Sequence, residues 1–123
     1  MAISIAANAE RRLIVATAVG DMTMEELQEF LRTVRTGPQR DWRLLFDATA
    51  ATMSLTSSQV QTLAAQVGGA LQQEGSRAAV AIVAPGDELY GMMRMYQILC
   101  ENQGITQIRV FRARAEAEVS LLG

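Results

Sequence analysis

The chain has 123 residues, half of them hydrophobic and a fifth charged, which is the size and composition of one domain that can bury a core. Its net charge is −2 and the charges are scattered, so the sequence lacks the basic stripe typical of nucleic-acid binding. All basic residues are arginine and Cys100 is the only cysteine, which excludes within one chain a Ser-His-Asp unit, a catalytic lysine, a histidine or cysteine-cluster metal site and a disulfide.

Residues 1–20 lack an early basic segment, and the polar residues 8–12 interrupt their apolar run. They therefore resemble neither a signal peptide nor a membrane span. Together with the lone cysteine, this predicts a cytoplasmic protein without a membrane span. The mostly apolar segments 3–7 and 11–20 flank the short polar segment 8–10, a pattern typical of a β-hairpin.

Residues 21–38 predict a helix with clear ends. Thr23 and Glu26 have the spacing of a capping box at its start, and Gly37-Pro38 marks its end. One apolar face follows the spacing i, i+3, i+4 and i+7 and consists of Leu27, Phe30, Leu31 and Val34.

Residues 42–48 predict a strand, with a polar loop after it. The next helix falls within residues 55–75, and Thr56, Ser57 and Ser58 are the candidates for its N-cap. Its apolar residues form one narrow stripe: Val60, Leu63, Ala64, Val67, Ala70 and Leu71. Gly68 and Gly69 lie inside this helix, where each costs roughly 1 kcal/mol against alanine, so we expect another backbone to approach closely there.

Residues 77–85 are almost continuously apolar, which predicts a strand covered on both faces. A long helix within residues 84–104, a short strand at 108–111 and a closing helix at 114–122 complete the chain. The order β-β-α-β-α-β-α-β-α predicts an α/β fold with a mostly parallel sheet and one antiparallel hairpin strand. Because no repeat or linker interrupts this order, we expect residues 1–123 to form a single domain.

Four segments together resemble the SpoIIAA-like STAS domains, and in particular their small stand-alone bacterial branch: RLIVATAVGDMTMEELQEFL, LLFDATAATMSLTSSQVQTLA, AVAIVAPGDELYGMMRMYQ and IRVFRARAEAEVSLL. The most distinctive element is the run from Tyr90 to Met95 after an alanine-rich strand, and Gly20, Asp47 and Phe111 also match the pattern. The resemblance implies a sheet of four or five strands with four helices packed on it and, often, a homodimer. It does not imply catalysis.

The resemblance also implies a candidate phosphoacceptor. In the anti-sigma factor antagonists of this family, a partner kinase phosphorylates a serine that follows an aspartate at the start of the second helix. The matching residue here is Ser57, but Thr56 stands before it, and Ser120 replaces the usual aromatic residue of the closing helix. The alternative interpretation is that Ser57 or Ser58 simply caps the helix.

Asp21, Asp47 and Asp87 each follow an apolar strand. If those strands are parallel, the three carboxylates could meet at the carboxyl edge of the sheet and form a Mg²⁺ site or a phosphorylated aspartate, as in response-regulator receivers. The chain lacks the acidic pair and the lysine that receivers use. The alternative is that Asp21 and Asp87 serve in turns and helix caps.

The helix within residues 84–104 has more apolar surface than one core-facing stripe needs. A first apolar face is predicted to pack on the sheet and consists of Leu89, Met92, Met93, Tyr96, Leu99 and Cys100. A narrow polar strip on the opposite side consists of Tyr90, Arg94, Gln97 and Glu101. A second apolar flank consists of Gly91, Met95 and Ile98.

Three explanations for this second flank are open. A neighbouring helix or loop of the same chain covers it, or it forms a homodimer interface in which Gly91 permits close approach and Met95 adapts to its partner. In the third explanation it lines an apolar ligand groove with Arg94 at the mouth to meet an anionic head group.

The leading functional hypothesis is a non-catalytic regulatory module that binds a protein partner and forms a homodimer, without a cofactor or a metal. The alternative is a carrier or sensor of a small apolar or anionic, lipid-like ligand. An enzyme ranks last because histidine and lysine are absent and no carboxylate pair has a supported geometry.

Overall fold

The computed structural model describes residues 3–74 and 79–122, and for residues 70–74 it describes the backbone alone. The strands are β1 (Ile3–Asn8), β2 (Leu13–Met22), β3 (Arg43–Met53), β4 (Val80–Val83) and β5 (Ile108–Phe111). The helices are α1 (Met24–Thr36), α2 (Ser57–Glu74), α3 (Asp87–Glu101) and α4 (Arg114–Leu122). The predicted order of elements and the α/β class are confirmed.

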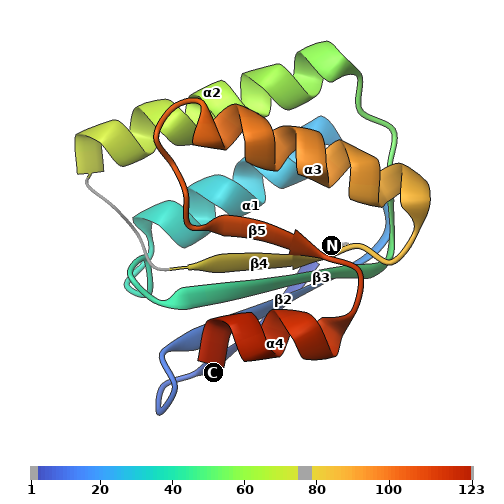
Figure 1. Cartoon of the computed structure of the whole chain (residues 1–123). Helices are drawn as coiled ribbons and strands as arrows, with labels where there is room; N and C mark the ends of the chain where they lie inside the picture. The colour runs from blue at the N-terminus through green and yellow to red at the C-terminus, as the bar shows by residue number, and fades with distance from the viewer. Residues whose placement is uncertain (1–2, 75–78, 123) are drawn as a thin grey trace.

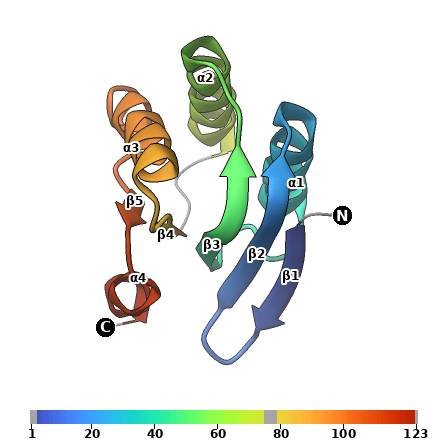
Figure 2. The same ribbon diagram turned by 90° about the vertical axis from the view of Figure 1, so that its right-hand side faces the viewer.

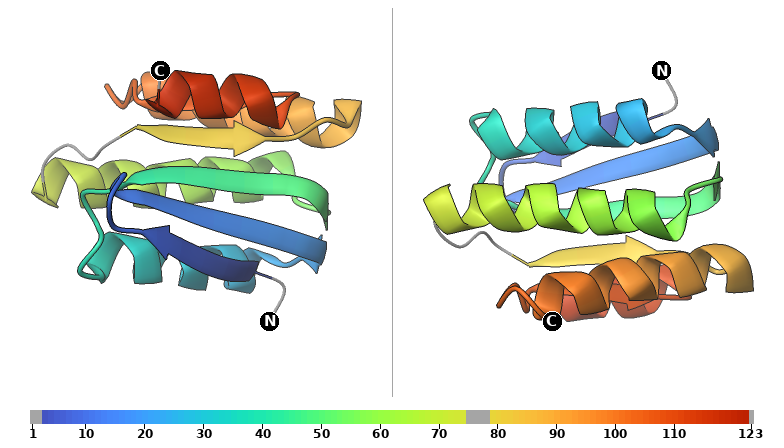
Figure 3. Two further views of the ribbon diagram at one scale, coloured as in Figure 1. Left: turned by 90° about the horizontal axis from the view of Figure 1, so that it is seen from below. Right: turned by 90° about the horizontal axis from the view of Figure 1, so that it is seen from above.

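The five strands form one sheet in the order β1-β2-β3-β4-β5. β1 runs antiparallel to β2, and all other neighbouring pairs are parallel. Helices α1, α2 and α3 lie side by side on one face, and α4 lies alone on the other (Figures 1 and 2). Seen from that second side, α4 lies near β4 and leaves β1 and β2 uncovered (Figure 3).

Local signals explain how these elements start and turn. Residues 9–12 connect β1 to β2, and Arg12 has φ 49°, a left-handed conformation that tight turns use. Thr23 and Glu26 form the predicted capping box at the start of α1, with the Glu26 amide donating to Thr23 Oγ1 at 3.2 Å and the Thr23 amide donating to Glu26 Oε1 at 3.1 Å. The sequence therefore encodes both the hairpin and the first crossover.

β3 is longer than expected, because residues 49–53, predicted to be a polar loop, continue the strand to Met53. Thr17 of β2 pairs with Asp47, but Val19 pairs with Ala50, so β3 contains one extra residue at this point. Such a β-bulge bends a strand and increases its twist without ending it. It allows β3 to follow β2 as far as Met22.

The two faces of the sheet have separate cores. On the face of α1–α3, residues Leu44 and Phe46 of β3 belong to one large cluster. On the opposite face, Leu45 packs with Ala117 and Leu121 of α4. All four residues of β4 are buried, which confirms the predicted strand covered on both sides.

In α2 the predicted stripe is buried at Val60, Leu63, Ala64 and Val67, while the side chains of Ala70 and Leu71 lie outside the described residues. The expected backbone contact at Gly68 is wrong. A Cβ on Gly68 would lie 1.9 Å from Oε1 of Gln103, so the glycine makes room for a side chain instead. Gln103 Nε2 donates to the Ala64 carbonyl at 3.0 Å and thereby joins the end of α3 to α2.

Candidate functional site

Ser57 lies at the first position of α2, where it is exposed. The residue that caps the helix is Thr56: the Gln59 amide donates to Thr56 Oγ1 at 3.1 Å, and the Thr56 amide donates to Gln59 Oε1 at 2.9 Å. The interpretation that Ser57 or Ser58 provides the cap is therefore wrong. Among the described residues, none forms a hydrogen bond with the Ser57 side chain.

Thr56 stands where the Asp-Ser pattern has aspartate, and it can perform the same capping role. Aspartate and threonine are both good N-cap residues, because each has a side-chain oxygen that accepts from the first turn. Thr56 performs this role and leaves the next hydroxyl, that of Ser57, uncommitted at the positive end of the α2 dipole. A phosphate on Ser57 would meet the free amides of the first turn.

α3 presents its core face as expected, since Met93, Tyr96 and Cys100 are buried. Burial raises the pKa of the Cys100 thiol from 9.0 to about 11, so the sulfur is protonated at neutral pH. A protonated, buried thiol is a poor nucleophile and a poor metal ligand. Cys100 is therefore part of the core.

The predicted polar strip of α3 is wrong at one position. Gln97 is 7% exposed, and its Oε1 accepts from the backbone amide of Val110 at 3.1 Å. Arg94 Nη1 donates to the same oxygen at 3.0 Å, and Gln97 Nε2 donates to Glu101 Oε2 at 3.1 Å. Arg94, Gln97 and Glu101 thus form a hydrogen-bonded chain that is joined to β5 at the Val110 amide.

Tyr90 and Arg94, both on the polar strip of α3, contact different residues. The guanidinium of Arg112 lies 4.1 Å from the centroid of the Tyr90 ring, a cation–π contact. Arg112 Nη1 also donates to Asp87 Oδ1 at 2.5 Å, which ties the start of α3 to the loop after β5. Arg94 is occupied by Gln97 as described above.

The second apolar flank of α3 is open in part. Ile98 is 46% exposed, Gly91 is exposed with no atom near the position of a Cβ, and Met95 is half-buried against the core. Burial of the whole flank under the same chain, one of the three explanations, is therefore wrong for the described residues. Met95 is the member that the chain itself covers in part.

The three aspartates do not form a joint site. Asp21 Oδ1 accepts from Thr52 Oγ1 at 3.2 Å, whereas Asp87 pairs with Arg112. Asp47 lies on the face of α4, inside β3 rather than after it, and pairs with Arg114 at 3.0 Å. Residues 3–74 and 79–122 contain no group of three or more His, Cys, Asp or Glu residues that could hold a metal ion.

Asp47 has a structural role at the bulge. Burial opposes its ionisation, but hydrogen bonds from the Thr49 hydroxyl and amide and from Arg114 outweigh burial, and its pKa is lowered below 3.8. The ionised carboxylate thus holds the extra residue of β3 and anchors the start of α4.

Two hollows near α1 and α2 were not predicted. An apolar cavity of about 70 Å³ lies between the sheet and helices α1–α3. A polar hollow of about 470 Å³ lies at the outer junction of α1 and α2. Leu31 and Val67 line both spaces. Arg94 does not line this cavity, and the groove expected beside it stays a prediction. The sequence carries one signal for the polar hollow, since Gln28, Arg32 and Arg35 have the spacing i, i+4 and i+7.

No helix among the described residues is both long and apolar enough to cross a membrane. No protein-family model matches the sequence, and no curated protein matches it. Among solved structures, the chain is similar to an uncharacterised protein of the DUF3478 family from Shewanella loihica PV-4, which has a SpoIIAA-like fold. The identity is 20%, the match covers 98% of this chain and 92% of that chain, and the TM-score is 0.56. The predicted SpoIIAA-like fold is confirmed, and at this identity the likeness concerns the fold alone.

Proposed function

We propose that this chain is a non-catalytic, cytoplasmic regulatory module that binds a protein partner in the manner of anti-sigma factor antagonists and pairs with a second copy of itself. Its SpoIIAA-like fold is compatible with such a role. The observation that carries the proposal is the partly open apolar flank of α3, in which Gly91 and Ile98 are exposed and Met95 is half-buried. Exposed apolar surface of this kind marks interaction sites more often than isolated surface residues do.

The flank has the shape that a helix pair needs. Gly91 has no side chain and no neighbour within 4 Å of a Cβ position, so a second helix can approach closely there. Met95 and Ile98, one and two turns further along, supply the apolar contact, and methionine adapts to an irregular partner. Two copies related by a twofold axis would place the same flank against itself.

Replacement Ile98→Asp tests the interface. Because Ile98 is 46% exposed, the monomer should stay folded within about 0.5 kcal/mol, while a charge in the interface should split the dimer. Light scattering of the purified protein measures the mass. The matched control is Val119→Asp, because Val119 is 69% exposed on α4, away from the flank. A dimer that survives Ile98→Asp, or a wild type that is monomeric at all concentrations, contradicts a homodimer through this flank.

Phosphorylation of Ser57 is the proposed switch for partner binding. The free hydroxyl at the start of α2 supports it, since a phosphate there is favoured by the helix dipole and adds up to two negative charges. Phosphopeptide mapping of the protein from native cells should find Ser57 modified, and Ser57→Ala should abolish the modification whereas Ser58→Ala should not. Modification of Ser58 alone, or of neither residue with partner kinases expressed, contradicts the switch.

A further inference from the structure

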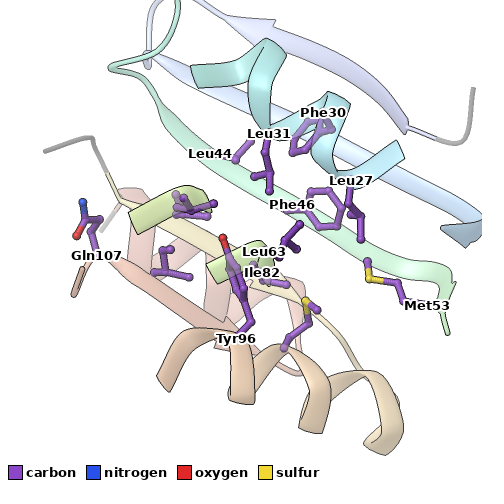
Figure 4. Close-up of a pocket in the computed structure, with 14 residues that line it drawn as sticks. Leu27, Phe30, Leu31, Leu44, Phe46, Met53, Leu63, Ile82, Tyr96 and Gln107 are labelled. Carbon is purple, nitrogen blue, oxygen red and sulfur yellow. The ribbon is translucent and has the colours of Figure 1, made fainter. Parts of the chain in front are cut away.

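The apolar cavity extends under α1 and α2, between Gln107 at one end and Met53 at the other (Figure 4). Its walls come from the inner faces of the three helices and from the sheet, including Leu27, Phe30, Phe46 and Leu63. The volume of about 70 Å³ is several times the ~10–15 Å³ that one water molecule needs by the same measure. Because the lining is almost entirely apolar, water gains few hydrogen bonds there, and a hydrocarbon group fits better.

The cavity has a neighbour on the outer surface. The hollow of about 470 Å³ at the junction of α1 and α2 is lined by Gln28, Leu31, Arg32, Arg35, Gln66 and Val67. Leu31 and Val67 line both spaces, so they form the boundary between the apolar interior and the polar exterior.

The positive charge of the outer hollow favours an anionic ligand. Two of its six lining residues are arginines and none is acidic. Arg32 forms an ion pair with Glu29, but the two side chains are 62% and 52% exposed, and a pair this exposed is weak and exchangeable. Across the hollow, Gln28 Nε2 donates to Gln66 Oε1 at 3.1 Å, a bond that a ligand would have to replace. Arg35 also has an interaction within the chain, so an anion in the hollow would have to exchange with the present partners of both arginines.

We propose that the α1–α2 junction is a binding site for a medium-chain fatty acid. The end of the hydrocarbon chain enters the cavity between Leu31 and Val67, and the carboxylate is held by Arg32 and Arg35, whose planar guanidinium groups match a carboxylate with two hydrogen bonds. The small cavity accepts the chain end, and the larger hollow accepts the rest of the chain and the carboxylate. This inference goes beyond the proposed function, because the site is formed without the outer flank of α3.

Binding of octanoate to the full chain tests the proposal, with calorimetry and equilibrium dialysis as the two measurements. We expect saturable binding with one site, weaker binding of butanoate because its chain is too short to reach the cavity, and weaker binding of octanol because it lacks the charge. Octyl phosphate distinguishes a general anionic head group from a carboxylate. No saturable octanoate binding at millimolar concentration overturns the proposal, as does equal affinity for octanol.

Three variants locate the site. Arg32→Gln combined with Arg35→Gln should weaken octanoate binding at least about tenfold, since each charged contact contributes on that scale. Leu31→Phe adds volume at a half-buried position on the boundary and should abolish binding without unfolding the chain, which thermal unfolding verifies. Arg94→Gln is the matched control on α3 and should bind like the wild type.

Each outcome for the variants decides the assignment. Unchanged binding by the double arginine variant, or by a folded Leu31→Phe, shows that octanoate lies elsewhere and overturns the proposal. A loss of binding in Arg94→Gln equal to that of the double variant does so too. Because Ile98→Asp leaves the α1–α2 junction intact, it should bind octanoate normally whether or not it dimerises, so the two proposals fail independently.

Discussion

Gln97 is the buried polar residue whose replacement has the most clearly defined effect. β5 is the last strand of the sheet, and the amide of Val110 points away from β4. Val110 is 8% exposed, so water reaches its amide poorly, and Gln97 Oε1 at 3.1 Å is the acceptor that satisfies it. An edge strand with unpaired amides also invites pairing with another chain. Gln97 therefore protects the edge of β5 as well as stabilising it.

Replacement Gln97→Met keeps the length of the side chain but removes the acceptor. A buried donor left without a partner costs about 1–3 kcal/mol. For a chain of this length, the unfolding entropy per residue converts 1 kcal/mol into about 4 °C, so the melting temperature should fall by about 4–12 °C. The greater apolarity of methionine offsets a part of this loss.

Urea unfolding at pH 7 measures the free energy, and hydrogen exchange of the Val110 amide measures the local effect. We expect the Val110 amide to exchange faster in Gln97→Met, while the core amides of β4 change only as far as global stability does. Gln66→Met is the matched control, because the Gln66 side chain is exposed and, within residues 3–74 and 79–122, bonds only to the half-buried Gln28. A loss below about 0.5 kcal/mol with Val110 still protected would refute the role of Gln97.

Three further predictions concern other buried groups. Gly68→Ala should leave the free energy of unfolding almost unchanged, because the gain in helix propensity of about 1 kcal/mol is offset by the displacement of Gln103. In a Gln103→Ala background the same change should stabilise the chain by about 1 kcal/mol in urea unfolding. Cys100 should react with a thiol reagent only on unfolding, and because its pKa is higher in the folded state, stability should fall from pH 9 to about pH 11 in wild type but less in Cys100→Ala. The lowered pKa of Asp47 contributes stability above pH 3.8 that is lost as the pH falls through the folded value, so Asp47→Asn should lower the urea midpoint at pH 7 more than at pH 3. An equal effect of Asp47→Asn at both pH values would contradict the role of the ionised Asp47. A fast thiol reaction of the native protein would contradict the burial of Cys100, and destabilisation by Gly68→Ala in the Gln103→Ala background would contradict the contact between Gly68 and Gln103.

Local patterns predicted those parts of the fold whose cause lies within a few residues. The capping box of Thr23 and Glu26 and the end of the first helix at Gly37 depend only on near neighbours in the chain, and both are present. The apolar run that became β4 needs no partner to be recognised as a strand buried on both faces. In the same way the order of elements follows from the two periodicities of strands and helices.

Contacts between residues distant in the chain decided the burial of Gln97 in α3 and the length of β3. Gln97 has a polar side chain beside the apolar stripe of α3, and only the position of β5 turned it from a surface residue into a buried hydrogen-bond partner. The continuation of β3 past Asp47 depends on β2 beside it and on Arg114, which is distant in the chain. No window of adjacent residues contains these partners.

The candidate site residues also fall into those that were predictable from the sequence and those that only the tertiary structure identified. The residue types alone excluded histidine and lysine chemistry and made the flank of Gly91, Met95 and Ile98 recognisable, whereas Ser57 was indicated by the family resemblance. Tertiary structure assigned the helix cap to Thr56, left Ile98 exposed, and placed Arg32 and Arg35 of α1 beside Val67 of α2. By itself the sequence determined the order, type and apolar faces of the elements, because hydrogen-bonding period and side-chain chemistry act locally. Which faces are covered and which hollows open between helices was decided only by packing, because those depend on residues that meet in space and not along the chain.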